Sequence, residues 1–176
     1  MLAVLSVMTL NLFLGADLTP AYEALGAGGG AAVPAAVAAI FNAGEPPGAV
    51  QQTDFAHRAG LLAKEIAAVR PDLIALQEAA AWRTRVPAGD GDSVEDHLAM
   101  LEAELADRGL RYRRAVTTTV GDVELPSAAG VSVGLTNRLA ILAREDGAVL
   151  GAPQSGGYAH TLPIETPLGT VGLARG

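Results

Sequence analysis

The 176-residue sequence contains no cysteine, so neither disulfide bonds nor thiolate metal sites can form. Aromatic residues make up only 4%, whereas 50% of the residues are hydrophobic. A chain of this length predicts one domain that buries roughly 70% of its unfolded surface. Therefore either the core is built from small side chains, or one apolar face of the domain requires another element to cover it.

Basic residues are also scarce. Lys64 is the single lysine, and 12 basic residues against 19 acidic ones give a net charge of −7. Because affinity for nucleic acid comes largely from neutralising phosphates, this balance argues against strong nucleic-acid binding. A bound metal ion would still supply the positive charge that a phosphate ester requires. The composition thus leaves metal-dependent chemistry on phosphate esters open.

Two long segments, residues 1–16 and 24–44, carry no charge. The first lacks the basic start of a secretory signal, so we interpret it as part of the fold and leave the compartment open, cytoplasmic or secreted. The second is long enough for a membrane span, but its alanines, glycines and Pro34 predict a loop with a short helix at 33–42. We therefore expect no transmembrane segment and treat residues 16–53 as a Gly/Ala/Pro-rich insertion.

The rest of the chain alternates between strand and helix patterns. Residues 3–13 and 72–78 predict strands, and 54–69 predicts the helix between them, which Pro71 ends. Strand, helix and strand form a crossover unit, which places both strands in one sheet. Residues 93–108 predict a second helix, with a capping box at Ser93 and Asp96. The later segments predict strands at 110–125 and 131–143, followed by a strand–turn–strand tail at 158–174. The predicted fold class is α/β (α+β), a mixed sheet with helices on one face.

A polar residue stands at the end of each strand of the crossover unit. Asn11 ends the first strand, and Glu78 follows the apolar run 73–76. Ligand sites of open α/β sheets gather at the carboxyl ends of the strands, so the amide and the carboxylate should meet there. Mg²⁺ prefers oxygen ligands and often takes only one or two carboxylates. We predict a Mg²⁺ (or Mn²⁺) site with Glu78 as metal ligand and Asn11 beside it as orienting partner; the alternative is that Glu78 simply meets water where the strand surfaces.

The sequence resembles the endonuclease/exonuclease/phosphatase superfamily, which has the DNase I-like fold, in VMTLNLFLG (7–15), RAGLLAKEIAAVRPDLIALQE (58–78) and LTNRLAILAR (135–144). In that family the Asn that ends the first strand and the Gln-Glu after the next belong to the active site. The resemblance implies a partial four-layer α/β/β/α sandwich in which residues 1–176 form the N-terminal part and the C-terminal half is absent. It also implies a divalent-metal-dependent phosphoric-ester hydrolase with Asn11 and Glu78 in its site.

Three further motifs of the family are missing from this sequence: Gly-Asp-x-Asn, a late Asp and a terminal Ser-Asp-His. The Asp96–His97 dipeptide lies inside the predicted helix 93–108, where we expect a capping residue and a solvated histidine. In that family the missing His polarises the scissile phosphate, and the Gly-Asp-x-Asn carboxylate helps to position or activate the attacking water. Glu78 would bind a metal without a partner for in-line attack, so we expect the chain alone to be inactive.

Other residues near these motifs are weaker candidates. The resemblance places a catalytic Tyr or His in the neighbourhood of Tyr158 and His160, where a surface turn is the alternative. Arg83 and Arg85 would contact a substrate phosphate or remain solvated, and Asn137–Arg138 would contact phosphate or serve the structure. The substrate class stays open, because one fold supports many functions.

Two other classes of function compete with the hydrolase. GAGGGA at 26–31 matches a dinucleotide-binding fingerprint, but that motif must follow a strand directly, and Tyr22–Leu25 intervene. The chain would otherwise be a non-catalytic fragment, or a half that needs a partner chain. If the chain is the N-terminal portion of the superfamily fold, we expect much of one sheet face to lack its cover and to promote self-association.

Overall fold

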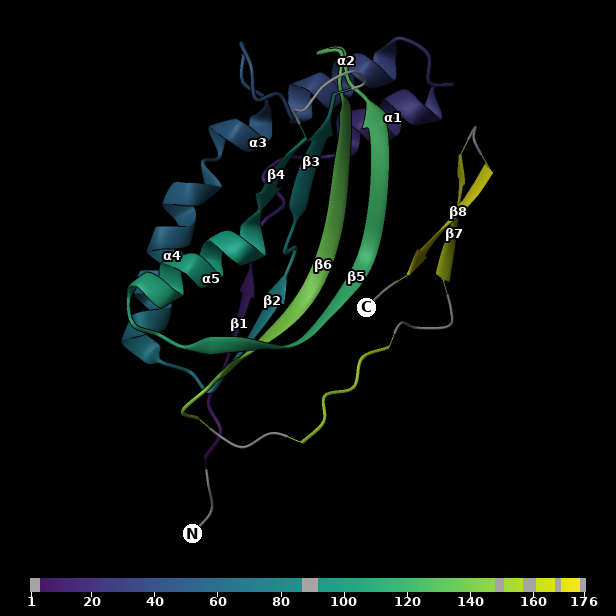
Figure 1. The fold of residues 1–176 in the computed structure, drawn as a ribbon. Coiled ribbons are helices and arrows are strands. Elements are labelled where there is room, and N and C mark those ends of the chain that lie inside the picture. The colour runs from purple at the N-terminus through teal and green to yellow at the C-terminus, as the bar shows by residue number, and fades with distance from the viewer. Residues whose placement is uncertain (1–3, 87–91, 148–150, 157–160, 167–168, 175–176) are drawn as a thin grey trace.

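The computed structural model describes residues 4–86, 92–147, 151–156, 161–166 and 169–174 (Figure 1). Its helices are α1 Thr19–Gly26, α2 Ala32–Ile40, α3 Ala49–Gln52, α4 Phe55–Val69 and α5 His97–Asp107. Its strands are β1 Val7–Asn11, β2 Leu73–Gln77, β3 Ala81–Arg85, β4 Ser93–Asp96, β5 Tyr112–Pro126, β6 Ser132–Arg144, β7 Thr161–Thr166 and β8 Gly169–Ala174. The fold is therefore of the α/β class, with a mixed sheet and helices.

Strand β6 is the centre of the main sheet. β5 pairs antiparallel with β6 along its whole length, so β2 and β3 share the other edge of β6. The residues Glu78–Ala80 separate β2 from β3. β1 lies parallel to β2 and β4 lies antiparallel to β3, and both strands end at this break. The break is where the candidate site lies.

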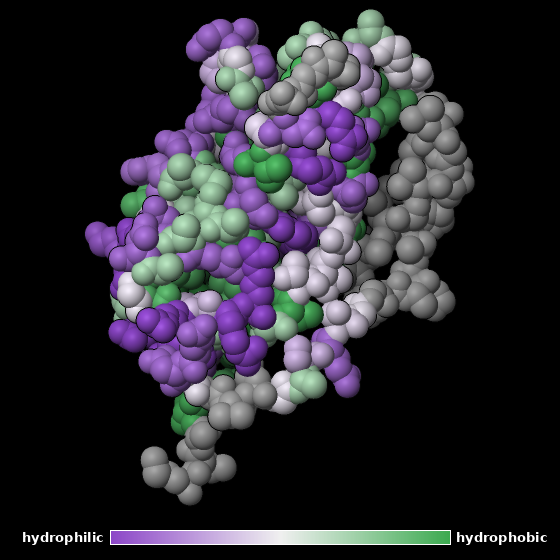
Figure 2. Space-filling view, in the orientation of Figure 1, coloured by the Kyte–Doolittle hydropathy of each residue, from purple (hydrophilic) through white to green (hydrophobic). Residues whose placement is uncertain are grey.

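The first hydrophobic core lies between helices α4 and α5 and the sheet. Residues 55, 59, 63 and 66 of α4 are fully buried, and they share this core with leucines of α5 and with Ile74, Leu76 and Leu142 of the sheet. The Asp54 carboxylate accepts a hydrogen bond from the His57 amide and caps α4. The outer side of these helices carries mostly hydrophilic and weakly hydrophobic side chains (Figure 2). The helix predicted at 54–69 is confirmed.

The segment predicted as an insertion loop, 16–53, builds a second hydrophobic core instead. The predicted helix at 33–42 is observed as α2, but α1 and α3 were not predicted. Their buried side chains pack against Val133 and Leu135 of β6 and against Trp82 of β3, whose ring stacks on Phe41 at 5.4 Å between centroids. The segment gathers at one end of the sheet (Figure 1) and is part of the folded body.

The helix predicted at 93–108 begins four residues later than expected. Residues Ser93–Asp96 form β4, and helix α5 starts at His97. The Ser93 hydroxyl lies 2.6 Å from that of Thr84 on the neighbouring strand, so it does not cap the helix. Val94 is 63% exposed, so it does not contribute to a buried helix face. Pairing with β3, a strand that was not predicted, overrides the helical pattern here.

The other predicted strands are observed in the described residues. The strands expected at 110–125 and 131–143 are β5 and β6, and the tail forms the antiparallel hairpin of β7 and β8. The expected parallel pairing of the first two strands is observed, although β1 spans only Val7–Asn11 of the predicted 3–13. Within the described residues, no helix is long and apolar enough to cross a membrane.

One face of the main sheet is not covered by α4 and α5. Thr9, Ala75, Ile141 and Val116 form a cross-strand row on that face. Ile141 is 37% exposed although it lies on the central strand, and Val7 on the edge strand is 60% exposed. A large aliphatic side chain of a central strand is usually buried, so this face is exposed around Ile141, whereas Val133 and Leu135 farther along β6 are buried in the second core.

Candidate metal-binding site

Asn11 and Glu78 meet at the break in the sheet. The parallel register places Asn11 opposite Gln77, one residue before Glu78. The Asn11 amide nitrogen donates to Glu78 Oε1 at 2.8 Å, and the Leu14 backbone amide donates to Glu78 Oε2 at 3.0 Å. The residue Glu78 as a whole is partly buried. Glu78 therefore does not simply point into water, because two donors fix both of its oxygens.

The backbone on both sides of this pair is strained. Phe13 has φ 61° and Glu78 has φ 53°, in the left-handed region that non-glycine residues rarely adopt. Among the described residues, the other two non-glycine positions with positive φ are Asp54 and Arg70, which cap the ends of α4. Such strain costs on the order of 1–3 kcal/mol per residue and clusters at functional sites. Phe13 and Glu78 cap no helix, so their strain points to a role in the site.

The loop that follows Asn11 is held by contacts from both cores. Asn11 Oδ1 accepts the Phe13 amide at 2.7 Å. The Arg58 guanidinium of α4 donates to the Leu12 carbonyl at 2.7 Å, and the Trp82 indole donates to the Leu14 carbonyl at 2.8 Å. These bonds order the loop whose Leu14 amide holds Glu78, so the carboxylate is positioned before any ligand arrives.

The donor set fits a hard cation only in part. Each Glu78 oxygen accepts one hydrogen bond and keeps further lone-pair capacity, whereas Asn11 turns its amide nitrogen toward the carboxylate and its amide oxygen accepts the Phe13 amide. Mg²⁺ commonly takes one or two carboxylates and fills its other positions with water and substrate phosphate. The described part of the chain holds no group of three or more acidic or histidine side chains arranged to bind a metal. The described residues therefore bring together one oriented carboxylate, Glu78, and the Asn11 amide, and do not complete a set of metal ligands.

Arg83 and Arg85, predicted near the site, do not join it. Arg83 pairs with Asp122 at 2.9 Å, and Arg85 lies 3.4 Å from Glu124, so both arginines bind acidic side chains of β5. The predictions for Tyr158 and His160 concern residues outside the described ranges. The described geometry thus rests on Asn11 and Glu78.

The glycine-rich GAGGGA stretch lies in a different setting from a dinucleotide fingerprint. Its first residue ends helix α1, and its last residue precedes helix α2. A dinucleotide-binding glycine loop joins a strand to a helix, because the helix must start at the pyrophosphate. The structure therefore contradicts this reading of residues 26–31.

Asp96 and His97 lie close to the break, but they differ from the expected cap and solvated histidine. Asp96 does cap α5, because its carboxylate accepts the Ala99 amide at 3.1 Å. The His97 side chain is fully buried and stacks on Phe55 at 3.8 Å between ring centroids. The prediction that His97 is solvated is thus wrong, because α5 starts at His97 and directs its side chain toward the core.

Asp96 makes stability dependent on pH. Burial would raise the pKa of Asp96, but hydrogen bonds from Arg138 and the Ala99 amide, and the charge of Arg138, hold it below the ordinary value of 3.8. Folded Asp96 binds protons less readily than unfolded Asp96. Its contribution is therefore fully present above about pH 4 and is lost as pH falls through the lower folded pKa.

We predict that wild type is more stable than Asp96→Asn at pH 6 and that this difference shrinks below about pH 4. Asparagine keeps the helix cap, so the difference reports the charge. Urea unfolding followed by the fluorescence of Trp82, the single tryptophan, measures it. Asp107→Asn, an exposed change on the same helix, is the control. A difference that stays constant from pH 6 to pH 3 would contradict the prediction.

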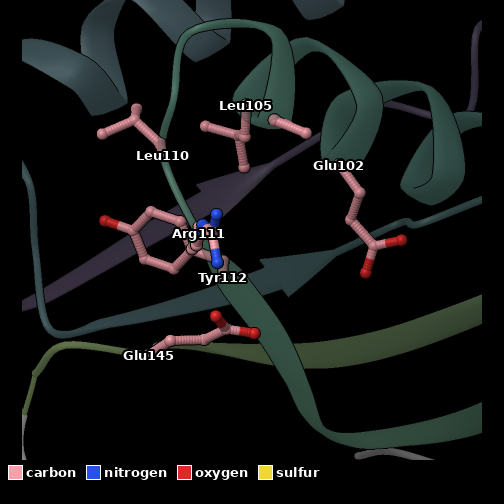
Figure 3. A pocket seen from close by; sticks show the side chains of 7 residues that line it. Glu102, Leu105, Leu110, Arg111, Tyr112 and Glu145 are labelled. Atoms are coloured by element: carbon pink, nitrogen blue, oxygen red, sulfur yellow. The ribbon is translucent and has the colours of Figure 1, made fainter.

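Two adjoining cavities lie at the opposite end of β2 from Glu78. One, of about 230 Å³, is lined by Glu102, Leu105, Ala106, Leu110, Arg111, Tyr112 and Glu145 (Figure 3). The other, of about 260 Å³, shares Leu110, Arg111 and Glu145 and reaches Arg70 and Arg144. Both mix acidic and basic groups without a converging set of either sign, so we assign no ligand to them.

Comparison with protein families, curated proteins and solved structures finds no match for this chain. The fold and the site are therefore interpreted from their own geometry.

Proposed function

We propose that this chain carries the metal-binding half of a divalent-metal-dependent phosphoric-ester hydrolase of the endonuclease/exonuclease/phosphatase type. The observation that carries the proposal is the contact between Asn11 and Glu78 at the ends of two adjacent parallel strands. The pairing is the one that the resemblance to this superfamily implies. The proposal includes the finer fold, in which the main sheet is one inner layer of a four-layer α/β/β/α sandwich.

The environment of Glu78 supports a metal rather than a purely structural role. Asp54 and Arg70 adopt a left-handed backbone as caps of α4, whereas Glu78 adopts φ 53° without capping a helix, and its carboxylate accepts the Asn11 and Leu14 amides. Mg²⁺ or Mn²⁺, when bound, would polarise a phosphoryl oxygen and lower the pKa of a water molecule. Glu78 would ligate the ion, and Asn11 and the Leu14 amide would orient the carboxylate.

Equilibrium binding of Mn²⁺ tests this proposal directly. Titration of the full chain, with free Mn²⁺ followed by electron paramagnetic resonance, should show one site that Mg²⁺ displaces competitively and that EDTA empties. Absence of any site that Mg²⁺ competes for would overturn the proposal. The substrate class is a separate question, because nucleic acid, lipid and small phosphate esters all suit this chemistry.

The chain alone is predicted not to hydrolyse phosphate esters. The described residues place no group at the site to polarise the phosphate or to activate water, and losing such groups costs orders of magnitude in rate. Bis(p-nitrophenyl) phosphate with Mg²⁺ or Mn²⁺ should show no turnover above that of the metal alone. Metal-dependent turnover that Glu78→Ala abolishes would show that the site is complete and that this prediction is wrong.

The open sheet face is predicted to cause self-association. Ile141 and Val7 expose aliphatic surface on this face. Light scattering coupled to size exclusion should give a mass that rises with concentration, and Ile141→Thr should reduce the rise. Leu61→Thr, at a 52% exposed position of α4, is the control and should leave it unchanged. A monomer at every concentration with sharp cooperative unfolding would contradict the prediction.

A further inference from the structure

Arg138, in the middle of β6, binds both residues that follow Glu78. Its Nε donates to the Ala79 carbonyl at 2.9 Å, and its Nη2 lies 3.4 Å from the Ala80 carbonyl. The backbone carbonyl of Arg138 also accepts the Ala79 amide at 2.9 Å. A single residue thus spans the break between β2 and β3.

Asp96 fixes the guanidinium of Arg138 from the other side. Nη1 and Nη2 of Arg138 donate to the two carboxylate oxygens of Asp96 at 3.1 and 2.5 Å. The two side chains are only 13% and 25% exposed, and Asp96 is itself held as the cap of α5. A two-pronged contact of this kind fixes the orientation of the guanidinium as well as its position.

The break is also tied to α5 through its backbone. The His97 amide donates to the Ala80 carbonyl at 3.0 Å, and the Ala80 amide donates to the Glu78 carbonyl at 2.8 Å. The backbone of Glu78 therefore has partners on its C-terminal side that do not depend on its own side chain. Release of these partners would allow its left-handed backbone to relax.

We propose that Arg138, held by Asp96, is the positioning residue of the site: it fixes the Ala79 and Ala80 carbonyls and thereby keeps Glu78 turned toward Asn11 and Leu14. As a statement about a metal site, the inference rests on the proposed function. The positioning itself requires no metal, because the Leu14 amide already reports where the Glu78 carboxylate lies.

Arg138→Met and Arg144→Met make a matched pair for the test. Arg144 is another β6 arginine in a partly buried ion pair, 2.8 Å from Asp72, and it lies at the far end of the strand. Both changes remove the arginine partner of a partly buried carboxylate and should lower stability. Amide hydrogen exchange at Leu14, measured by NMR, and Mn²⁺ affinity then separate positioning from general destabilisation.

Arg138→Met should increase exchange at Leu14 at least about tenfold more than Arg144→Met does, and should weaken Mn²⁺ binding by about 10–100-fold. Equal exchange at Leu14 in the two variants would overturn the inference. If Arg138→Met does not fold, Asp96→Asn, which keeps the helix cap, replaces it and should also increase the amide exchange rate at Leu14. An unchanged exchange rate at Leu14 in Asp96→Asn would overturn the inference. A wild-type chain without Mn²⁺ affinity would remove the proposed function, whereas the Leu14 comparison would still decide the positioning.

Discussion

Replacing Glu78 with glutamine is expected to lower the affinity for Mn²⁺ by at least about 100-fold. Both oxygens of the Glu78 carboxylate are oriented, one by Asn11 and the other by the Leu14 amide. Changes to residues that only orient a ligand already cost about 10–100-fold in metal affinity, so losing the ligand's charge costs more. Asn11→Ala, which removes only the orienting partner, is expected to fall within that smaller range.

Titration of wild type, Glu78→Gln and Asn11→Ala with Mn²⁺ under one set of conditions measures this effect. Glu104→Gln is the matched control, because Glu104 pairs with Arg108 on the surface of α5 and lies outside the site. It should bind Mn²⁺ as wild type does. Unchanged affinity in Glu78→Gln, with its fold intact by circular dichroism, would mean that the ion binds elsewhere.

Replacing Phe55 with alanine is expected to lower the free energy of unfolding by about 3–5 kcal/mol. Phe55 begins helix α4 and is 1% exposed. Its ring stacks on His97, and the Arg58 guanidinium lies over it at 5.3 Å from the centroid. Because Arg58 also holds the Leu12 carbonyl, the resulting cavity should loosen the loop that follows β1.

Urea denaturation of Phe55→Ala and Phe55→Leu measures this loss. The leucine variant fills much of the space and should lose clearly less stability. Val69→Ala removes an aliphatic side chain from the same helix at a position that is 60% exposed, and should change stability by less than about 1 kcal/mol. Phe55→Ala as stable as Val69→Ala would show that the first core does not depend on this ring.

The crossover unit and its two polar side chains could be predicted from sequence because their signals are local. Helix 54–69 shows a clear apolar repeat, a capping Asp54 and a stop at Pro71, and the structure confirms it. A helix of that length between two short strands fixes their parallel pairing. Parallel strands that end together then bring Asn11 and Glu78 into contact without further information.

The sequence misled where tertiary pairing decides the local structure. Residues 93–96 fit a helical cap and stripe, but they pair with β3 along an edge that the local pattern does not reveal. The segment 16–53 is rich in alanine and glycine, and its helix faces differ little in hydrophobicity. The hydrophobic pattern therefore did not predict helix α1. Its burial against Trp82 became visible only with the sheet in place.

The role of Arg138 had no local signal at all. Its partners, Ala79, Ala80 and Asp96, lie 42 to 59 residues away along the chain. Sequence reasoning therefore left it between a structural and a phosphate-contacting role. The contacts of Arg138 with Ala79 and Ala80 support the structural role, because these residues follow Glu78 directly.

The most direct test of the central claim is to locate the bound ion by the broadening that Mn²⁺ causes in amide NMR signals of the full chain. Mn²⁺ held by Glu78 should broaden the amide signals of Leu14 and Ala79 first. At the same Mn²⁺ concentration, the amide signals of Glu145 and Gly147, at the far end of the sheet, should stay sharp. Glu78→Gln should abolish the effect. Broadening that starts around Glu145 and Asp146, or that persists unchanged in Glu78→Gln, would contradict a metal site at the break between β2 and β3.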